Sequence, residues 1–249
     1  MEIIWRVGPD EITRLRSFVT VRQENPFVRY RIARNVSGPP TTVEVGLFWE
    51  RLVGALLTSQ QRSGPNSHIS QFLRSRPFRL SYDFYAEHQD AEVAGRDKLR
   101  IFGGIRFSSR IAEFLARDFA LLNEGLWPET RDALESLAGA DSPKLERQAA
   151  DFIRKHFAGF GPKQSRNLLQ GLGLTKYEIP IDSRITKWLN DFGFPVYLSA
   201  GGLTDPDYYN FVSDGIQALC QQCGVLPCIF DAAVFSSYDT GWTEDNVLW

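Results

Sequence analysis

A turn of glycines and a proline in the middle of the chain separates two segments with helical patterns, and this feature limits the fold most strongly. The turn reads FAGFGPK, from Phe157 to Lys163. Glycine permits backbone conformations that a Cβ atom would block, and proline suits the first position of a helix, where its missing N–H is not needed. The sequence therefore predicts a helix over 143–156, a tight turn, and a second helix that begins at Pro162.

Most other long segments also show the period of amphipathic helices. We expect helices over 10–21, 46–61, 108–122, 128–137, 208–223 and 228–238. In the segment 22–36, Val28, Tyr30 and Ile32 alternate with arginines, which indicates a strand or an irregular arm, whereas 78–99 has no clear period. A serine is also placed to cap the helix over 108–122. The predicted class is mainly α, with strands, if any, confined to the N-terminal 45 residues.

The composition is that of an ordinary globular protein. The chain has 249 residues, of which 43% are hydrophobic and 23% charged, so it can bury one large core or two modest lobes. No apolar run approaches the about 20 residues that a membrane-spanning helix needs. The first residues lack the layout of a signal peptide, and three cysteines are too few for a disulfide scaffold. We therefore expect a cytoplasmic protein without a membrane partner.

The net charge of −2 hides two basic segments. Six arginines but one acid lie between Arg14 and Arg34, and seven basic residues but three acids lie between Asp151 and Lys187. A local patch of this kind can bind phosphates even when the total charge is near zero. Solvated helix faces would explain either segment alone.

Two side chains near the turn have the character of functional groups. Lys163 lies in the first turn of the predicted helix, whose free N–H groups and positive end can bind an anion such as a phosphate. Asp182 follows nineteen residues later, placed to cap a helix that begins at Ser183. Its apolar frame, Ile179-Pro180-Ile181, would partly desolvate the carboxylate, as functional acids often require. A plain helix turn, a solvated lysine and a simple cap remain the structural alternatives.

These features resemble the helix-hairpin-helix DNA glycosylases, which combine a GxG hairpin, a lysine at its exit in bifunctional members, and an aspartate at the next helix start. Gly159, Gly161, Lys163 and Asp182 match this pattern, whereas Ser165 stands where the family often has alanine. The segment WERLVGALLTSQQ resembles the family's first core helix and the turn that inserts a wedge into DNA. GIRFSSRIAEFL, ERQAADFIRKHFAGFGPKQSRNLLQGLG and FDAAVFSSYDTG are similar to the archaeal-type 8-oxoguanine DNA glycosylases.

The resemblance implies two helical lobes with a helix-hairpin-helix motif and a DNA-binding cleft between them. Residues 1–45 would form an N-terminal helix and arm. Residues 46–249 would form the glycosylase core, with the C-terminal helices returning to the first lobe. The implied protein is a monomer that binds damaged double-stranded DNA, associates with the nucleoid and uses no cofactor or metal.

The resemblance also implies base excision repair by a DNA glycosylase with AP lyase activity. Such an enzyme flips an oxidised purine out of the duplex, and the resemblance implies 8-oxoguanine as that purine. Lys163 would attack the sugar as a neutral amine and form a Schiff base, Asp182 would stabilise the developing charge, and β-elimination would cut the strand. The alternatives are a glycosylase for another damaged base and a non-catalytic helix-hairpin-helix DNA-binding protein.

Further site residues are expected by position in the family pattern. DNA contacts are expected from Gly159, Gly161, Lys163, Gln164, Ser165 and Arg184, with Gln60 as the wedge and Gln61 as its alternative. A polar helix end would explain both glutamines equally well. The base pocket is expected to include Phe235, Asp231 and Trp249, with Trp242 also near; core packing is the alternative for the aromatic residues and a structural role for Asp231.

The three cysteines, Cys220, Cys223 and Cys228, form a C-x2-C-x4-C pattern that invites a metal interpretation. An iron–sulfur cluster would need a fourth cysteine, and His68, His88 and His156 are not at the spacing of a zinc ligand. We therefore expect buried free thiols and no metal site.

Overall fold

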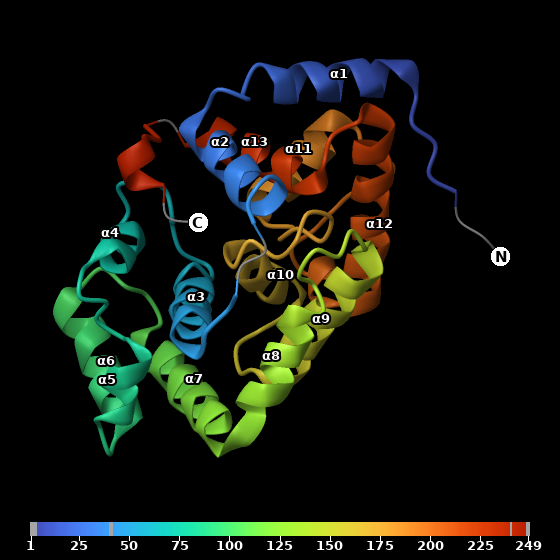
Figure 1. The fold of residues 1–249 in the computed structure, drawn as a ribbon. Coiled ribbons are helices and arrows are strands. Elements are labelled where there is room, and N and C mark those ends of the chain that lie inside the picture. The colour runs from blue at the N-terminus through green and yellow to red at the C-terminus, as the bar shows by residue number, and fades with distance from the viewer. Residues whose placement is uncertain (1–3, 40–41, 240, 248–249) are drawn as a thin grey trace.

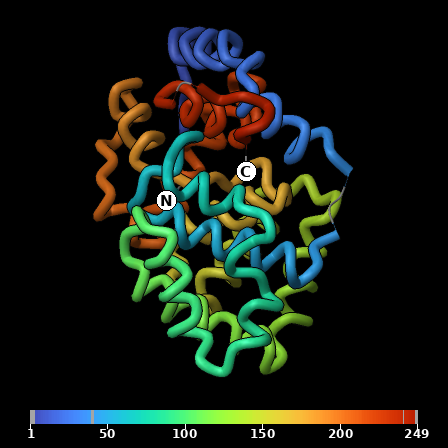
Figure 2. Tube along the Cα trace, turned by 90° about the vertical axis from the view of Figure 1, so that its left-hand side faces the viewer, coloured from blue at the N-terminus to red at the C-terminus, as the bar shows by residue number. Residues whose placement is uncertain are grey.

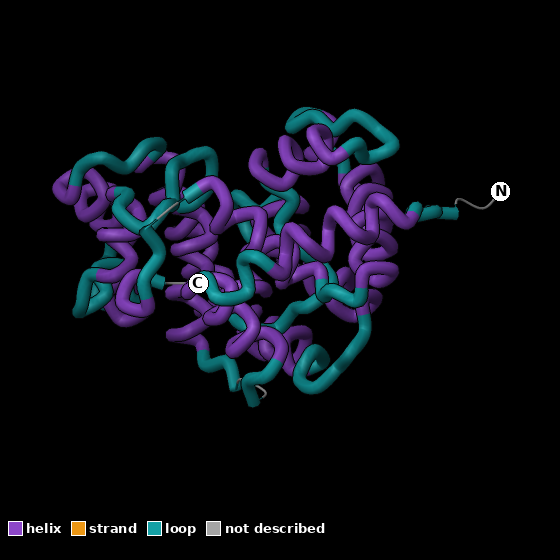
Figure 3. The backbone as a smooth tube through the Cα atoms, turned by 90° about the horizontal axis from the view of Figure 1, so that it is seen from above, coloured by secondary structure: helices purple, strands orange, loops and turns teal. Residues whose placement is uncertain are grey.

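The protein is all-helical in the part that the structure describes. The computed structural model describes residues 4–39, 42–239 and 241–247, and within these ranges it has helices and loops but no strand (Figure 3). Its elements in chain order are α1 (Pro9–Thr20), α2 (Pro26–Arg31), η1 (Ile32–Val36), α3 (Val45–Leu57), α4 (His68–Arg74), α5 (Tyr82–Ala86), α6 (Ala91–Phe102), α7 (Ser108–Leu121), η2 (Leu122–Leu126), α8 (Trp127–Glu135), α9 (Pro143–His156), α10 (Pro162–Gly171), α11 (Ser183–Phe192), η3 (Gly202–Thr204), α12 (Pro206–Cys223), α13 (Pro227–Tyr238) and η4 (Glu244–Asn246). The mainly α prediction is confirmed.

The segment expected as a strand or an irregular arm is a helix instead. Asn25 caps α2, because its Oδ1 accepts a hydrogen bond from the backbone N–H of Phe27 at 2.9 Å, and Pro26 occupies the first helical position. Phe27, Val28 and Arg31 are buried on one face of this helix. The strand interpretation is therefore wrong, since the cap and the proline outweigh the short alternation of apolar residues.

Buried side chains form two clusters, which divide the helices into two lobes. The first lobe contains α3–α10, and the second contains α1 and α2 together with α11–α13. Figures 1 and 2 show α1 lying over the second lobe, far from α5 and α6. Residues 1–45, expected as an N-terminal unit, thus supply α1 and α2 to the lobe that the C-terminal helices complete.

Helix α10 lies in the middle of the molecule and is held by both parts of the chain (Figure 1). Its buried Leu168 and Leu169 belong to the core of the first lobe. Next to these leucines, the Gln170 carbonyl accepts hydrogen bonds from Arg34 Nη2 at 2.9 Å and Asn35 Nδ2 at 3.1 Å. The helix that carries Lys163 is therefore fixed at its carboxyl end by the N-terminal arm.

The segment 78–99, which has no clear sequence period, packs on α3 through α5 and on α7 through α6. Ser81 caps α5, since its Oγ accepts from the N–H of Phe84 at 3.1 Å. The buried Tyr85 ring meets Trp49 edge-on, with 5.0 Å between ring centroids. These contacts make the segment part of the core of the first lobe.

No single helix in the described ranges is long and apolar enough to cross a membrane. Helices α12 and α13 reach that length and composition only as a pair, bent by 97°.

Candidate active site

The hairpin between α9 and α10 is built around Gly159. Its φ of +81° lies in the left-handed region, and a Cβ atom there would lie 2.5 Å from Phe114 Cδ2 and 2.8 Å from Leu56 Cδ2. Both the backbone conformation and the close packing therefore require glycine. The turn joins α9 to α10 as the sequence predicts, and α10 begins at Pro162.

A buried carboxyl group from α7 holds this turn. Asp118 Oδ1 accepts a hydrogen bond from the backbone N–H of Ala158 at 2.7 Å, while its Oδ2 is buried without a hydrogen-bond partner among the described residues. Burial raises the pKa of Asp118 from 3.8 to about 8, although Ala158 and Arg117 act in the opposite direction. The group is therefore mainly neutral at pH 7 and holds the hairpin as an acceptor.

We expect the Asp118→Asn substitution to stabilise the protein more at pH 8 than at pH 5. Because the pKa of Asp118 is raised in the folded state, folding binds a proton between about pH 4 and pH 8, and stability falls as the pH rises through that window. Asparagine accepts the same N–H bond without titrating. The difference in Tm between variant and wild type should grow by on the order of 5 °C, measured by thermal unfolding at both pH values. Glu113→Gln, on an exposed position of α7, should show no such pH dependence; an equal Tm difference at both pH values for Asp118→Asn contradicts the assignment.

Lys163 is the second residue of α10, and its side chain is drawn into the protein. Its Nζ donates a hydrogen bond to Gln164 Oε1 at 2.9 Å. Burial lowers the pKa of Lys163 from its ordinary 10.5, while the charges of Asp182 and Asp231 act in the opposite direction. The environment thus moves the amine toward its neutral, nucleophilic form.

Asp182 caps α11 as the sequence predicts. Its Oδ1 accepts hydrogen bonds from the backbone N–H groups of Arg184 at 2.8 Å and Ile185 at 3.0 Å. The preceding Ile179 and Ile181 are buried. Because the charge of Asp182 acts on the pKa of Lys163, the fold brings the amine and the carboxylate into one site.

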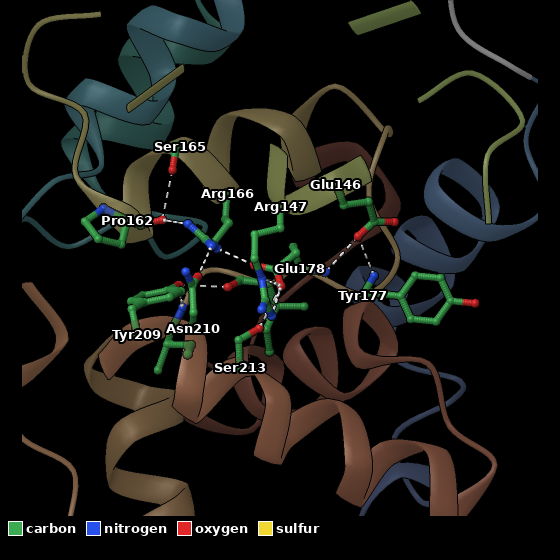
Figure 4. Close-up of polar contacts among 12 residues, drawn as sticks. Glu146, Arg147, Pro162, Ser165, Arg166, Tyr177, Glu178, Tyr209, Asn210 and Ser213 are labelled. Carbon is green, nitrogen blue, oxygen red and sulfur yellow. Dashed lines mark hydrogen bonds and ion pairs between the residues drawn. The ribbon is translucent and has the colours of Figure 1, made fainter. Parts of the chain in front are cut away.

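Buried acidic side chains hold the loop between α10, which carries Lys163, and Asp182 (Figure 4). Glu146 accepts hydrogen bonds from the backbone N–H groups of Lys176, Tyr177 and Glu178 at 2.7, 2.8 and 2.7 Å. These contacts place the loop before Asp182, and no sequence rule relates Glu146 to residues some thirty positions later.

Glu178 itself sits in a buried ion network, which Figure 4 also shows. Its carboxylate lies 2.6 Å from Arg166 Nε and 2.7 Å from Arg147 Nη2. Arg166 Nη2 also donates to Asn210 Oδ1 at 2.8 Å, and its Nη1 donates to the Pro162 carbonyl at 3.1 Å. The network therefore ties α9, the first turn of α10 and α12 to the loop that leads to Asp182.

Two residues that were expected to contact DNA, Gln164 and Ser165, are buried instead. Gln164 is buried, and its Nε2 donates to the Ala55 carbonyl at 2.6 Å. Ser165 is fully buried, and its Oγ donates to the Pro162 carbonyl at 3.0 Å. Both follow Lys163 on the core side of α10, so their side chains do not reach the surface of the hairpin.

Of the two glutamines expected as the wedge, only Gln60 has an exposed side chain. It lies just beyond α3 with a left-handed φ of 55°. Gln61 is engaged, because its Nε2 donates to the Leu57 carbonyl at 2.9 Å and its Oε1 accepts from the Arg106 N–H at 2.7 Å. The geometry therefore favours Gln60 over Gln61.

Arg106 and Phe107, which the sequence did not single out, border the Gln60 turn. Arg106 Nη1 donates to the Gln60 carbonyl at 3.4 Å, and Phe107 is 45% exposed with a φ of 59°. Phe107 is also the residue before α7, which begins at Ser108 without a side-chain cap, so the expected serine cap is wrong. The GIRF sequence matched the family pattern, but only the fold shows that this loop touches the turn.

Comparisons with known proteins agree on one fold. Over 154 residues the chain is 24% identical to the 8-oxoguanine DNA glycosylase/AP lyase of Sulfolobus acidocaldarius, a match that covers 62% of this chain and 66%, just under two thirds, of that relative. The crystal structure of the Methanocaldococcus jannaschii 8-oxoguanine DNA glycosylase superposes with a TM-score of 0.67 at 15% identity, covering 94% of this chain and 97% of that one. The chain has the fold of the 8-oxoguanine DNA glycosylases.

The same fold appears in a DNA complex. The Methanocaldococcus jannaschii 8-oxoguanine glycosylase/lyase bound to a 15mer DNA containing 8-oxoguanine has a TM-score of 0.62 at 14% identity, covering 90% of this chain and 96% of that one. No family model matches the chain. The resemblance to the archaeal-type glycosylases is therefore confirmed through a sequence relative and through the fold.

Within this glycosylase fold, Arg184, which was expected to contact DNA, forms ion pairs with two aspartates of the protein. Its guanidinium lies 3.3 Å from Asp182 Oδ2 and 2.8 Å from Asp239 Oδ2, and it lies 4.3 Å from the centroid of the Phe235 ring. A Cβ atom on Gly64, in the loop that follows the Gln60 turn, would lie 2.9 Å from Asp239 Oδ1. Arg184 therefore joins Asp182 to the region where the two lobes meet.

The expected base-pocket residues of the glycosylase fold are mostly packed. Phe235 is half-buried and stacks on Phe27 of the second lobe's core, with 4.8 Å between ring centroids. Asp231 is buried and pairs with Arg31 at 3.1 Å; burial raises its pKa to about 6, although Arg31 opposes the shift. Trp249 lies outside the described residues.

The cysteines are buried free thiols in the second lobe. Burial raises the pKa of Cys228 to about 12, so the thiol is neutral. Across the described ranges, no group of three or more His, Cys, Asp or Glu side chains could hold a metal ion.

Proposed function

We propose that the chain is a bifunctional DNA glycosylase/AP lyase that excises an oxidised purine, 8-oxoguanine first, from double-stranded DNA. The observation that carries this proposal is the half-buried Lys163 side chain in the first turn after the hairpin, whose pKa is lowered by desolvation and raised by the charge of Asp182. A lysine with a lowered pKa beside a carboxylate fits covalent catalysis at a sugar. The activities named for the similar proteins support the same assignment.

The reaction begins when the damaged nucleotide leaves the duplex, at a cost of about a few kcal/mol. The backbone around Gly159 and Gly161 binds phosphates, and Gln60 fills the gap in the base stack. The lone pair of Lys163 Nζ then forms a bond to the sugar C1′. The glycosidic bond breaks with its electron pair on the base, which takes up a proton. Asp182, as a carboxylate, stabilises the positive charge that develops on the sugar.

The same intermediate accounts for strand cleavage. After a proton passes from Nζ to the ring oxygen, the sugar opens and leaves an iminium ion between Nζ and C1′. Loss of a C2′ proton then breaks the C3′–O bond, and the 3′ phosphate departs. Water finally hydrolyses the imine and regenerates Lys163.

Duplexes that each carry a single lesion test this proposal. With 8-oxoguanine we expect release of the base, strand cleavage, and a covalent protein–DNA adduct when borohydride reduces the imine. Cleavage confined to an alkylated purine or an oxidised pyrimidine would favour another glycosylase specificity. Salt-sensitive binding without any cleavage would favour a non-catalytic DNA-binding protein.

We expect Asp182→Asn to slow excision by about 10²-fold while the protein stays folded. Asparagine caps helices as well as aspartate does, so the helix start at Ser183 is kept and only the charge is lost. Because the charge of Asp182 raises the pKa of Lys163, its removal should also move the acidic limb of the pH–rate profile to lower pH. Single-turnover rates across pH measure both effects. Asp191→Asn, on an exposed position of the same helix, serves as the control; an unchanged rate in Asp182→Asn contradicts the assigned role.

A further inference from the structure

Gln164 is a buried amide that links the proposed nucleophile to another helix. Its Oε1 accepts from Lys163 Nζ at 2.9 Å, and its Nε2 donates to the carbonyl of Ala55, on α3, at 2.6 Å. We propose that Gln164 is a positioning residue that fixes the Lys163 amine against the carboxyl end of α3, beside the Gln60 turn. This inference rests on the function proposed for Lys163.

The chemistry of the two partners sets the orientation of the amide. A backbone carbonyl can only accept, so the nitrogen of the Gln164 side chain must face Ala55. The oxygen then faces Lys163, which donates in either protonation state. One side chain thus makes both contacts, and it cannot rotate without losing both.

The Ala55 carbonyl, on α3, does not accept the backbone N–H of the residue four positions later, as it would in a continuing helix. Ser59, which would bond to Ala55 in a continuing helix, donates instead to the Leu56 carbonyl at 3.1 Å. The Ala55 carbonyl instead accepts from Thr58 Oγ1 at 3.0 Å and from Gln164 Nε2, so Gln164 ties α10 to the end of α3. The next residue after Ser59 is Gln60, so the amine and the proposed wedge are held by the same helix end.

The contact also directs the lone pair of the amine. A neutral amine has two N–H bonds and one lone pair, and one N–H is held by Gln164 Oε1. The lone pair then points away from that oxygen, free for the sugar. Without the acceptor, the four-carbon side chain can turn about its bonds, and a displacement of about 1 Å in a reacting group can slow a reaction about 10²-fold.

Three variants test the inference by single-turnover adduct formation with borohydride on the 8-oxoguanine duplex across pH. We expect Gln164→Leu, which removes both contacts, to slow adduct formation about 10²-fold at every pH, including the alkaline plateau. Gln164→Glu keeps an acceptor for Lys163 but loses the donor to the Ala55 carbonyl, so it should recover part of the plateau rate. Its acidic limb should move to higher pH, because a carboxylate favours the ammonium form of Lys163.

Asn167→Leu is the matched control, because it removes a hydrogen bond between the same two helices without touching Lys163. Asn167 Nδ2 donates to Thr58 Oγ1 at 3.1 Å. This variant should keep the wild-type rate and pH profile. Equal slowing in Asn167→Leu and Gln164→Leu, a Gln164→Leu rate equal to wild type, or a Gln164→Glu variant as slow as Gln164→Leu would overturn the inference. These outcomes are separate from failure of the proposed function, in which wild-type protein forms no adduct.

Discussion

Replacing Lys163 by glutamine should abolish the covalent adduct with lesion DNA and slow base release by more than about 10³-fold. Glutamine keeps a polar side chain of similar length at the second position of α10, but it has no amine lone pair. The loss should appear at every pH, because no titration restores a nucleophile. Borohydride trapping followed by denaturing electrophoresis measures the adduct, and single-turnover kinetics measure base release.

The control for this variant is Lys155→Gln, at an exposed lysine in the last turn of α9 on the same hairpin. This substitution removes the same charge near the turn that we propose to bind DNA, so it separates phosphate binding from nucleophilic attack. We expect weaker DNA binding and an undiminished yield of adduct at saturating protein. A full yield from Lys163→Gln would instead remove Lys163 from the mechanism.

Replacing Glu178 by leucine should lower the free energy of unfolding by about 3–5 kcal/mol. The loss leaves Arg166, whose side chain is 1% exposed, as a buried charge that has lost its ion-pair partner. Because 1 kcal/mol shifts the Tm of a protein of this size by about 2–4 °C, the expected fall is on the order of 10 °C. Urea unfolding followed by circular dichroism at neutral pH measures the change.

Two further variants test whether the unpaired charge of Arg166, rather than the altered packing at position 178, causes the loss of stability. Asp191→Asn breaks the exposed pair with Lys187, and it should leave the urea midpoint of unfolding close to that of the wild type. The double variant Arg166→Met with Glu178→Leu should recover part of the lost stability, since no unpaired charge remains on α10. A Glu178→Leu protein that unfolds with the wild type would show that the network contributes little.

Local sequence rules predicted much of the site. The Gly159 turn, the start of α10 at Pro162 and the cap at Asp182 follow from properties of single residues and their neighbours. Local rules failed at α2, where a cap and a proline over one turn outweighed the alternating pattern that suggested a strand.

Contacts between distant residues could not be predicted in this way. Asp118 reaches Ala158 only because α7 packs beside the hairpin, and Gln164 faces α3 because of the rotation of α10. The family pattern fixes which residues flank Lys163 but not which of them point inward. Phe235 is a similar case, since an aromatic side chain on α13 serves core packing as readily as base stacking.

The second lobe combines segments that lie before and after the first lobe in the sequence, and this has a consequence during synthesis. Helices α1 and α2 are translated before α3–α10, whereas α11–α13, which complete their core, are translated after them. The first lobe can therefore condense while α1 and α2 still expose their apolar faces. The second lobe is therefore complete only when α13 emerges and brings Asp231 to Arg31.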